Sequence, residues 1–239
     1  SMQTPHRSRP GSSPPTSSFV PWVLLLLLPL LLGSCAFGDR VMLMKEFETS
    51  LAAKSLPALS GKVVHVSEFK DAAENADVTA KWTETEAGPD PDGFEYREMT
   101  GKEEDAWDAE LAKRKAGKAV SDLPVVGWMR NGFGMHTSDV RSVNPPSEWL
   151  KQTLELELAG QGAKLGPEAG ADIVIKGTIR YRKVDIYMSN WANLVVDFEF
   201  QVRGGSPIRK TIHTSGKQMA WSSSAFEFYR AFRRCQQKM

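Results

Sequence analysis

Two cysteines and four histidines are among the side chains of this sequence that could act as nucleophiles or metal ligands. Cys35 and Cys235 cannot build a disulfide framework, and they lack the paired spacing of a zinc site. Beyond the first 34 residues, the histidines are His65, His136 and His213, and none belongs to an HExxH motif. No G-x-S-x-G motif is present, and the carboxylates are scattered along the chain. We therefore predict no catalytic residue, no metal site, no cofactor and no enzyme activity.

The residues before Cys35 form a short apolar segment. Arg7 and Arg9 precede this segment, no acidic residue does, and residues 20–32 are apolar with two prolines among them. A helix that spans a membrane needs about 20 apolar residues, so this run is too short to remain in a bilayer. The pattern is typical of an export signal, which we place at residues 1–34.

The apolar run ends in Leu32-Gly33-Ser34-Cys35, which resembles the bacterial lipobox, an aliphatic residue and two small residues before a cysteine. The resemblance implies that the Cys35 sulfur receives a diacylglyceryl group, that a peptidase cuts before Cys35, and that the new amino terminus is acylated, with palmitate as the expected acyl group. Two or three acyl chains hold a protein stably at a membrane. The alternative is an ordinary secretory signal, cut near Ser34 or Ala36, that leaves Cys35 as a free thiol.

The residue after Cys35 bears on the location of the protein. In the enterobacterial lipoproteins that this motif resembles, an Asp there directs retention in the inner membrane, and Ala36 stands in its place. The resemblance therefore implies a cell-envelope protein anchored in the outer membrane and facing the periplasm. The formal net charge is +1, so no global field attracts nucleic acid, and we predict no nucleic-acid partner.

For the sequence from Cys35 onward, we predict a tether and first segment over residues 35–60 and a single periplasmic α+β domain over residues 61–239. Its fold class is an antiparallel sheet with helices packed on one face, carried on a lipid tether. Alternating apolar residues over 173–186 and 192–202 predict two strands with one solvated face, with a β-bulge near Arg182-Lys183. Further strands are expected at 41–44, 61–69, 124–129 and 207–221, the last following a turn at Gly204-Gly205.

Two helices complete this domain. One is expected to begin at Pro145, with Asn144 as its cap, and to end at Gly160 or Gly162. The other follows a capping box formed by Ser224 and Glu227. The apolar stripe of the last helix extends toward Cys235. This cysteine is either a small buried apolar side chain or a redox or metal thiol.

Residues 84–124 form a charged insertion. A run of good helix formers occupies 102–118, with a narrow apolar stripe at Trp107 and Leu111. This helix is either a projection that binds a partner or a solvated insertion lying on the domain. Three other tryptophans, Trp128, Trp191 and Trp221, fall near strand ends, where they mark either an interface or ordinary packing.

The order of these elements resembles that of the YajG-type family of uncharacterised bacterial lipoproteins. In that family a helix ending at a glycine precedes Ala/Val-Asp-hydrophobic at the start of a long strand, as Gly162 and Ala171-Asp172-Ile173 do here. The resemblance covers about residues 120–239 and loosely 61–70, and the charged insertion departs from it. It implies a compact α+β domain on a membrane tether and supplies no catalytic residues.

Two functions fit these predictions. The first is a membrane-anchored lipoprotein that binds or scaffolds an unidentified protein of the bacterial cell envelope. The second is an auxiliary subunit of an envelope transporter that binds lipid or another apolar ligand. In both, the membrane is contacted through acyl chains on Cys35. A groove between the sheet and the helices would favour the second function, and an exposed aromatic patch on a packed sheet would favour the first.

Overall fold

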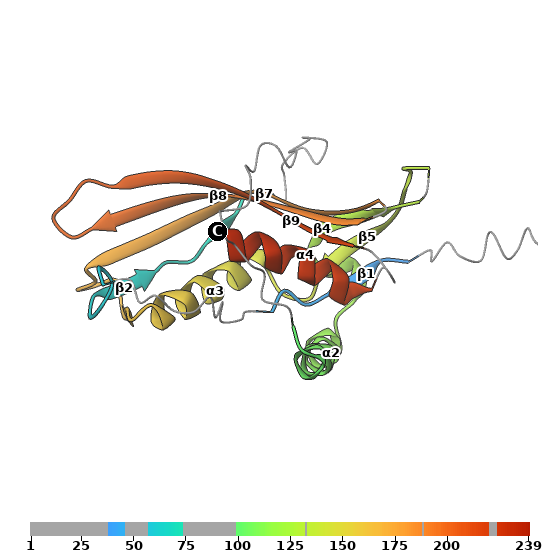
Figure 1. Ribbon diagram of the computed structural model, residues 1–239, viewed down its shortest axis with the longest axis horizontal. Helices are drawn as coiled ribbons and strands as arrows, with labels where there is room; N and C mark the ends of the chain where they lie inside the picture. The colour runs from blue at the N-terminus through green and yellow to red at the C-terminus, as the bar shows by residue number, and fades with distance from the viewer. Residues whose placement is uncertain (1–37, 46–56, 74–98, 132, 188, 220–223) are drawn as a thin grey trace, which may run out of the picture. The chain divides into compact units, whose positions relative to one another are not determined.

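The computed structural model describes residues 38–45, 57–73, 99–131, 133–187, 189–219 and 224–239. All of them fall in one structural unit, Phe37–Met239. Within these residues, one mixed sheet is accompanied by three α-helices, which confirms the α+β prediction (Figure 1). None of the helices in this part of the chain has the length and apolar character needed to cross a membrane.

The strands are β1 (Arg40–Met42), β2 (Val63–Val66), β3 (Lys70–Asp71), β4 (Val125–Arg130), β5 (His136–Ser142), β6 (Lys164–Leu165), β7 (Ile173–Tyr187), β8 (Ser189–Val202) and β9 (Ile208–Met219). The helices are α2 (Gly101–Lys115), α3 (Pro146–Gly160) and α4 (Ala225–Lys238), with a short 3-10 turn η2 (Val120–Asp122) after α2.

The long strand β7 organises the sheet. One of its edges pairs antiparallel with β8, which in turn pairs antiparallel with β9, so the predicted meander is present. Its other edge is shared by β2, β3 and β4, which all lie parallel to it. Beyond them, β6 joins β2 in parallel, β5 joins β4 antiparallel, and β1 joins β5 in parallel.

The sheet is thus mixed, whereas the sequence predicted an antiparallel one. Alternation with a period of two identifies a strand but carries no information about its direction. The meander follows from short turns between neighbouring strands. The parallel pairs join β7 to strands that precede it by tens of residues, and no local signal marks such pairs.

The β-bulge in β7 lies between Ile179 and Tyr181, two residues before the predicted position. After the bulge, Arg182 faces inward and pairs with Asp71 of β3 at 2.7 Å, with only 2% of the arginine side chain exposed. The prediction misplaced the bulge because it assigned inward positions to apolar residues alone. A charged side chain occupies one of them, and its partner lies 111 residues away.

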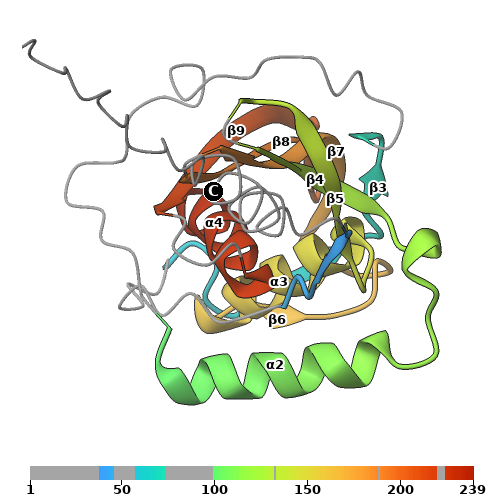
Figure 2. The same ribbon diagram turned by 90° about the vertical axis from the view of Figure 1, so that its right-hand side faces the viewer.

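Helices α3 and α4 lie on the same side of the sheet, which curves around them (Figures 1 and 2). The inward stripe of α4 consists of Phe228, Tyr229, Phe232 and Cys235, all fully buried. Ser224 caps this helix by accepting a hydrogen bond from the Glu227 N–H. The helix approaches β9 closely at Gly216, where a Cβ atom would lie 2.2 Å from the carbonyl oxygen of Ala231.

Asn144 does not cap α3, contrary to the prediction. The residue at the N-cap position is Pro145, which makes no side-chain cap. The Asn144 amide instead binds the backbone of Met44: its Oδ1 accepts from the N–H at 3.1 Å, and its Nδ2 donates to the carbonyl at 2.9 Å. Asn144 therefore holds the segment after β1, because it offers the donor and acceptor that this segment needs where β1 ends.

Helix α2 lies on the domain through one aromatic side chain. Trp107 is 1% exposed, stacks on Tyr229 with ring centroids 5.5 Å apart, and meets Phe226 edge-on at 5.3 Å. Its indole N–H donates to the Leu43 carbonyl at 2.9 Å. Residues 84–98 of the predicted insertion lie outside the described residues, so the boundaries of that insertion stay a prediction.

Candidate ligand-binding site

The residues predicted to carry the lipid, Cys35 and the lipobox Leu32, Gly33 and Ser34, lie outside the described residues. The described residues begin at Gly38, two residues before β1. Lipid attachment at Cys35 therefore stays a prediction from the sequence.

The structure places the three histidines of the described chain on three different strands. His65 of β2 shares a hydrogen bond with the Gly166 carbonyl at 3.0 Å, and His136 of β5 shares one with Asp139 at 3.1 Å. His213 lies in β9. Among the residues that the structure describes, no group of three or more His, Cys, Asp or Glu side chains could hold a metal ion.

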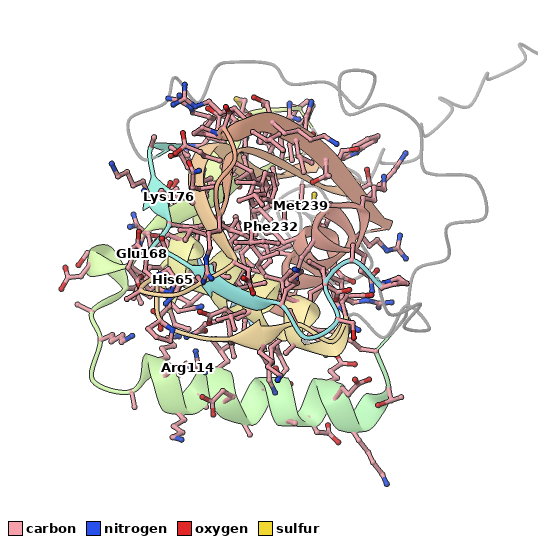
Figure 3. The ribbon with its side chains drawn as sticks, turned by 90° about the vertical axis from the view of Figure 1, so that its left-hand side faces the viewer. His65, Arg114, Glu168, Lys176, Phe232 and Met239 are labelled. Carbon is pink, nitrogen blue, oxygen red and sulfur yellow. The ribbon has the colours of Figure 1, made fainter. Side chains whose placement is uncertain are left out.

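A cavity of about 330 Å³ lies between the inner face of the sheet and helices α3 and α4. This volume falls at the lower end of the range for small-molecule sites, ~300–1,000 Å³. Its apolar lining consists of Leu150, Leu154, Phe198, Phe200, Ile212 and Met239. In Figure 3, Met239 lies within the curve of the sheet, whereas Lys176 lies on the outer side.

The local sequence explains why these side chains converge. Leu150 and Leu154 are one helical turn apart and lie on the same face of α3. Phe198 and Phe200 are two residues apart on β8 and therefore share the inner face of the sheet. Their rings stack with centroids 5.8 Å apart, and Phe69 meets Phe198 edge-on at 5.9 Å. One wall of the cavity is thus an aromatic surface.

Two polar side chains of this lining have no hydrogen-bond partner within the described part of the chain. Thr153 of α3 is 4% exposed and Gln236 of α4 is 5% exposed, yet the threonine hydroxyl and both polar atoms of the glutamine amide are unpaired there. An unsatisfied buried polar group costs about 1–3 kcal/mol. Apolar walls with an unpaired hydroxyl and amide suit a ligand that combines an apolar chain with a hydrogen-bonding head.

Glu157 of α3 also lines the cavity, but its carboxylate already has a partner. Its Oε1 accepts a hydrogen bond from the Gln161 side chain at 3.1 Å. The unpaired groups of the wall are therefore neutral ones, and a neutral or singly charged head fits them better than a metal ion, which prefers several carboxylates or imidazoles.

Cys235 is fully buried, as the first of the two interpretations of its sequence position expected. Its S–H donates to the Ala192 carbonyl at 3.0 Å. Burial raises the pKa of its thiol, which keeps the sulfur in the unreactive protonated form. Cys235 is a packing residue in this structure.

A wider depression of about 780 Å³ lies on the outer face of β7, β8 and β9. Its lining is rich in charge, and much of that charge is paired: Arg180 with Asp197 at 2.6 Å, and Arg209 with Glu199 at 2.8 Å. Hydrogen bonds from Thr211 and Arg180 hold the pKa of the Asp197 carboxyl below its usual value. This surface suits polar contacts.

Trp128 and Trp191, the two of the singled-out tryptophans that the structure describes, do not form an exposed aromatic patch. The Lys183 ammonium lies 3.5 Å from the ring centroid of Trp128, and that of Lys217 lies 4.3 Å from the ring centroid of Trp191. Both rings are partly buried, and cation–π contacts of this kind cover their faces. Trp221 lies outside the described residues.

Sequence reasoning did not identify Thr153 and Gln236, although a signal was present. Gln236 follows Phe232 by four residues, and Thr153 follows Leu150 by three, so both polar residues fall on the apolar stripes of their helices. A polar residue on a buried stripe needs a partner. That requirement could have marked both positions.

Comparisons with known proteins give no family. No family model matches the chain, and no curated protein matches it by sequence. The membership in the YajG-type family implied by the sequence is therefore not shown.

Several solved structures are similar to this chain. Protein XCC0632 from Xanthomonas campestris, of family DUF330, is 9% identical over 83% of this chain and 88% of that one, with a TM-score of 0.43. An uncharacterised protein is 9% identical over 84% and 92%, with a TM-score of 0.42. The lipoprotein GNA1162 from Neisseria meningitidis is 14% identical over 69% and 89%, with a TM-score of 0.23. Similar structures thus include uncharacterised proteins and a bacterial lipoprotein, and at these TM-scores they carry no argument about function.

Proposed function

We propose that this chain is a lipid-anchored protein of the bacterial cell envelope that binds a fatty acid or a lipid acyl chain between its sheet and helices α3 and α4. Cys35 holds the protein at the membrane, and the cavity holds the ligand without changing it chemically. The observation that supports this function most is the pair of unpaired polar side chains, Thr153 and Gln236, in an otherwise mostly apolar wall.

The anchor rests on the sequence Leu32-Gly33-Ser34-Cys35 after a short apolar run. Each buried CH₂ group contributes about 0.8 kcal/mol to membrane binding, so one acyl chain gives marginal attachment and two or more give a stable one. The diacylglyceryl group and the palmitate proposed for Cys35 meet this requirement. Ala36 after the cysteine supports the outer membrane, with the domain facing the periplasm.

The cavity supports this ligand class. Leu150, Leu154 and the stacked rings of Phe198 and Phe200 offer dispersion contacts to an apolar chain. The Thr153 hydroxyl and the Gln236 amide nitrogen are shielded from solvent in the ligand-free chain, and they can donate hydrogen bonds to a carboxyl or ester head once their side chains rotate toward it. This chemistry supports the role of an auxiliary subunit in an envelope transport system for lipids, because such a subunit must hold an acyl chain out of water and release it unchanged.

The outer face supports a second candidate, a scaffold for an envelope protein. Lys70, Lys176 and Lys210 line the outer depression and are exposed, and no ion pair within the described residues involves them. A partner with acidic side chains would complement these ammonium groups. The depression has no apolar floor comparable with that of the inner cavity, so we place this candidate second.

A binding titration tests the first function. The full chain, freed of bound lipid, is titrated with a fluorescent fatty acid, and we expect saturation at one ligand per chain. Leu154→Trp fills the cavity and should weaken binding at least tenfold, whereas Leu165→Trp, at an exposed leucine of β6, should bind as the wild type does. Circular dichroism checks that both variants are folded. Equal affinities for the two variants would show that the fatty acid binds elsewhere.

A further inference from the structure

The tip of the β4–β5 hairpin exposes two large apolar side chains. Phe133 is 90% exposed and Met135 is 60% exposed. Phe133 is the most exposed large apolar residue in the described part of the chain. Adjacent apolar side chains held out into solvent are unfavourable unless another apolar surface covers them, so they indicate a contact site.

The described residues of the tip, 131 and 133–135, are joined by hydrogen bonds. The Asn131 side chain accepts hydrogen bonds from the backbone N–H groups of Phe133 and Met135, both at 3.0 Å. The Gly134 N–H donates to the Asn131 carbonyl at 2.8 Å, and the Asn131 N–H donates to the Met135 carbonyl at 2.9 Å. Gly134 adopts a φ of 80°, which a side chain would disfavour. Because these hydrogen bonds already hold the backbone of Phe133 and Met135, binding through their side chains costs less conformational entropy.

The tip lies at the end of the sheet where the described chain begins. β1 runs parallel to β5, with Arg40 beside Val140, so Gly38 lies on the side of β1 that faces the hairpin tip (Figure 1). Three residue steps join Gly38 to Cys35, and they span at most about 11 Å when fully extended. A membrane that holds acyl chains on Cys35 is therefore close to Gly38, whatever path those residues take.

The carboxylates at this end are neutralised by basic neighbours. Asp39 pairs with Arg141 at 2.6 Å, and Asp139 pairs with the same guanidinium at 3.0 Å. Asp185 pairs with Arg130 at 2.8 Å. This pairing lowers the repulsion that free carboxylates would feel near anionic lipid head groups.

We propose that Phe133 and Met135 insert into the interfacial layer of the bilayer that holds Cys35 and thereby dock the domain on the membrane in one orientation. This inference rests on the proposed lipid anchor. In that orientation the β8–β9 hairpin points away from the membrane. On β7, Gly177 pairs with Phe198 of the cavity wall and Ile186 pairs with Met129 near the hairpin tip. These two positions are roughly 30 Å apart along the strand, so the ligand cavity lies away from the lipid head groups.

Lipid-borne quenchers test this orientation. The full lipidated chain is purified in detergent and reconstituted into vesicles of phosphatidylethanolamine and phosphatidylglycerol that carry a spin-labelled lipid. An environment-sensitive fluorophore is attached at Phe133→Cys or, as the matched control, at Ile208→Cys, an exposed apolar site where β9 begins. The unaltered lipidated chain, whose Cys235 is buried, serves as the labelling blank. We expect several-fold quenching at residue 133 and unchanged emission at residue 208.

Intact mass spectrometry separates this proposal from the anchor itself. Acylated chain on the vesicles with residue 133 no more quenched than residue 208 would overturn the docking orientation and leave the anchor standing. Shielding of the label at residue 133 only after an envelope protein is added would likewise overturn the docking orientation. A chain without acyl groups on Cys35 would overturn both proposals.

Discussion

Replacing Gln236 by methionine should stabilise the ligand-free protein and weaken its binding of the ligand. Gln236 is 5% exposed, and neither atom of its amide has a hydrogen-bond partner in the described residues. Methionine has a similar length, is apolar and adapts to irregular space. Removing the two unsatisfied atoms should raise the free energy of unfolding by about 1–2 kcal/mol, within the range for such groups. For a chain of this size, that change corresponds to a rise in melting temperature of about 2–8 °C.

The same substitution removes a hydrogen bond to the head of the ligand. A net hydrogen bond contributes about 0.5–1.5 kcal/mol, so the affinity for a fatty acid should fall by up to about tenfold. Melting curves of delipidated protein, with and without ligand, measure both effects. Gln201→Met is the control, because the Gln201 amide donates to the Gly205 carbonyl at 2.8 Å and its loss should not stabilise the fold. A lower melting temperature for Gln236→Met would show that the amide is satisfied and would refute the reasoning about this wall.

Three further predictions concern the sheet and α4. Phe198→Asp should lower the free energy of unfolding by several kcal/mol, because it buries an unpaired charge. Glu199→Lys alters the solvated face of the same strand and should lower that free energy far less. Equal losses of stability in a denaturant titration would mean that the strand register is wrong. Gly216→Ala places a methyl group 2.2 Å from the Ala231 carbonyl oxygen and should lower the free energy of unfolding by about 1–3 kcal/mol. An unchanged free energy in the same titration would contradict the close packing of α4 on β9. Cys235 should react with a thiol reagent much faster in denaturant than in the native chain, and rapid native labelling would refute its burial.

The strands of the meander could be predicted because exposure follows their alternation. Ala192, Leu194, Val196 and Phe198 are buried at every second position of β8, as the period of two indicated. The last helix could be predicted equally well, because its apolar stripe and its Ser224 cap lie within a few residues of one another. Both features depend on local sequence alone.

Features that depend on distant residues could not be predicted in the same way. The position of the bulge follows from the burial of Arg182 beside Asp71, and the role of Asn144 follows from its contact with Met44, 100 residues earlier. The parallel pairing of β2, β3 and β4 along one edge of β7 is likewise set by how distant segments meet.

The ligand cavity belongs to the same class of features. It is assembled from α3, β8, β9 and α4, and its volume depends on how far the two helices stand from the sheet. No pattern within one element determines that separation. From the sequence, only two residues of the cavity could have been recognised, Thr153 and Gln236, as polar residues on apolar helical stripes.

Metabolic labelling with a fatty-acid analogue is the most direct test of lipid attachment at Cys35. Full-length protein expressed in a bacterial host is labelled, denatured and separated on a denaturing gel, so that any acyl chain held only in the cavity is removed. We expect a covalent label on the wild-type chain and none on Cys35→Ser. An unlabelled wild-type chain, or a label that persists in Cys35→Ser, would contradict the proposed anchor.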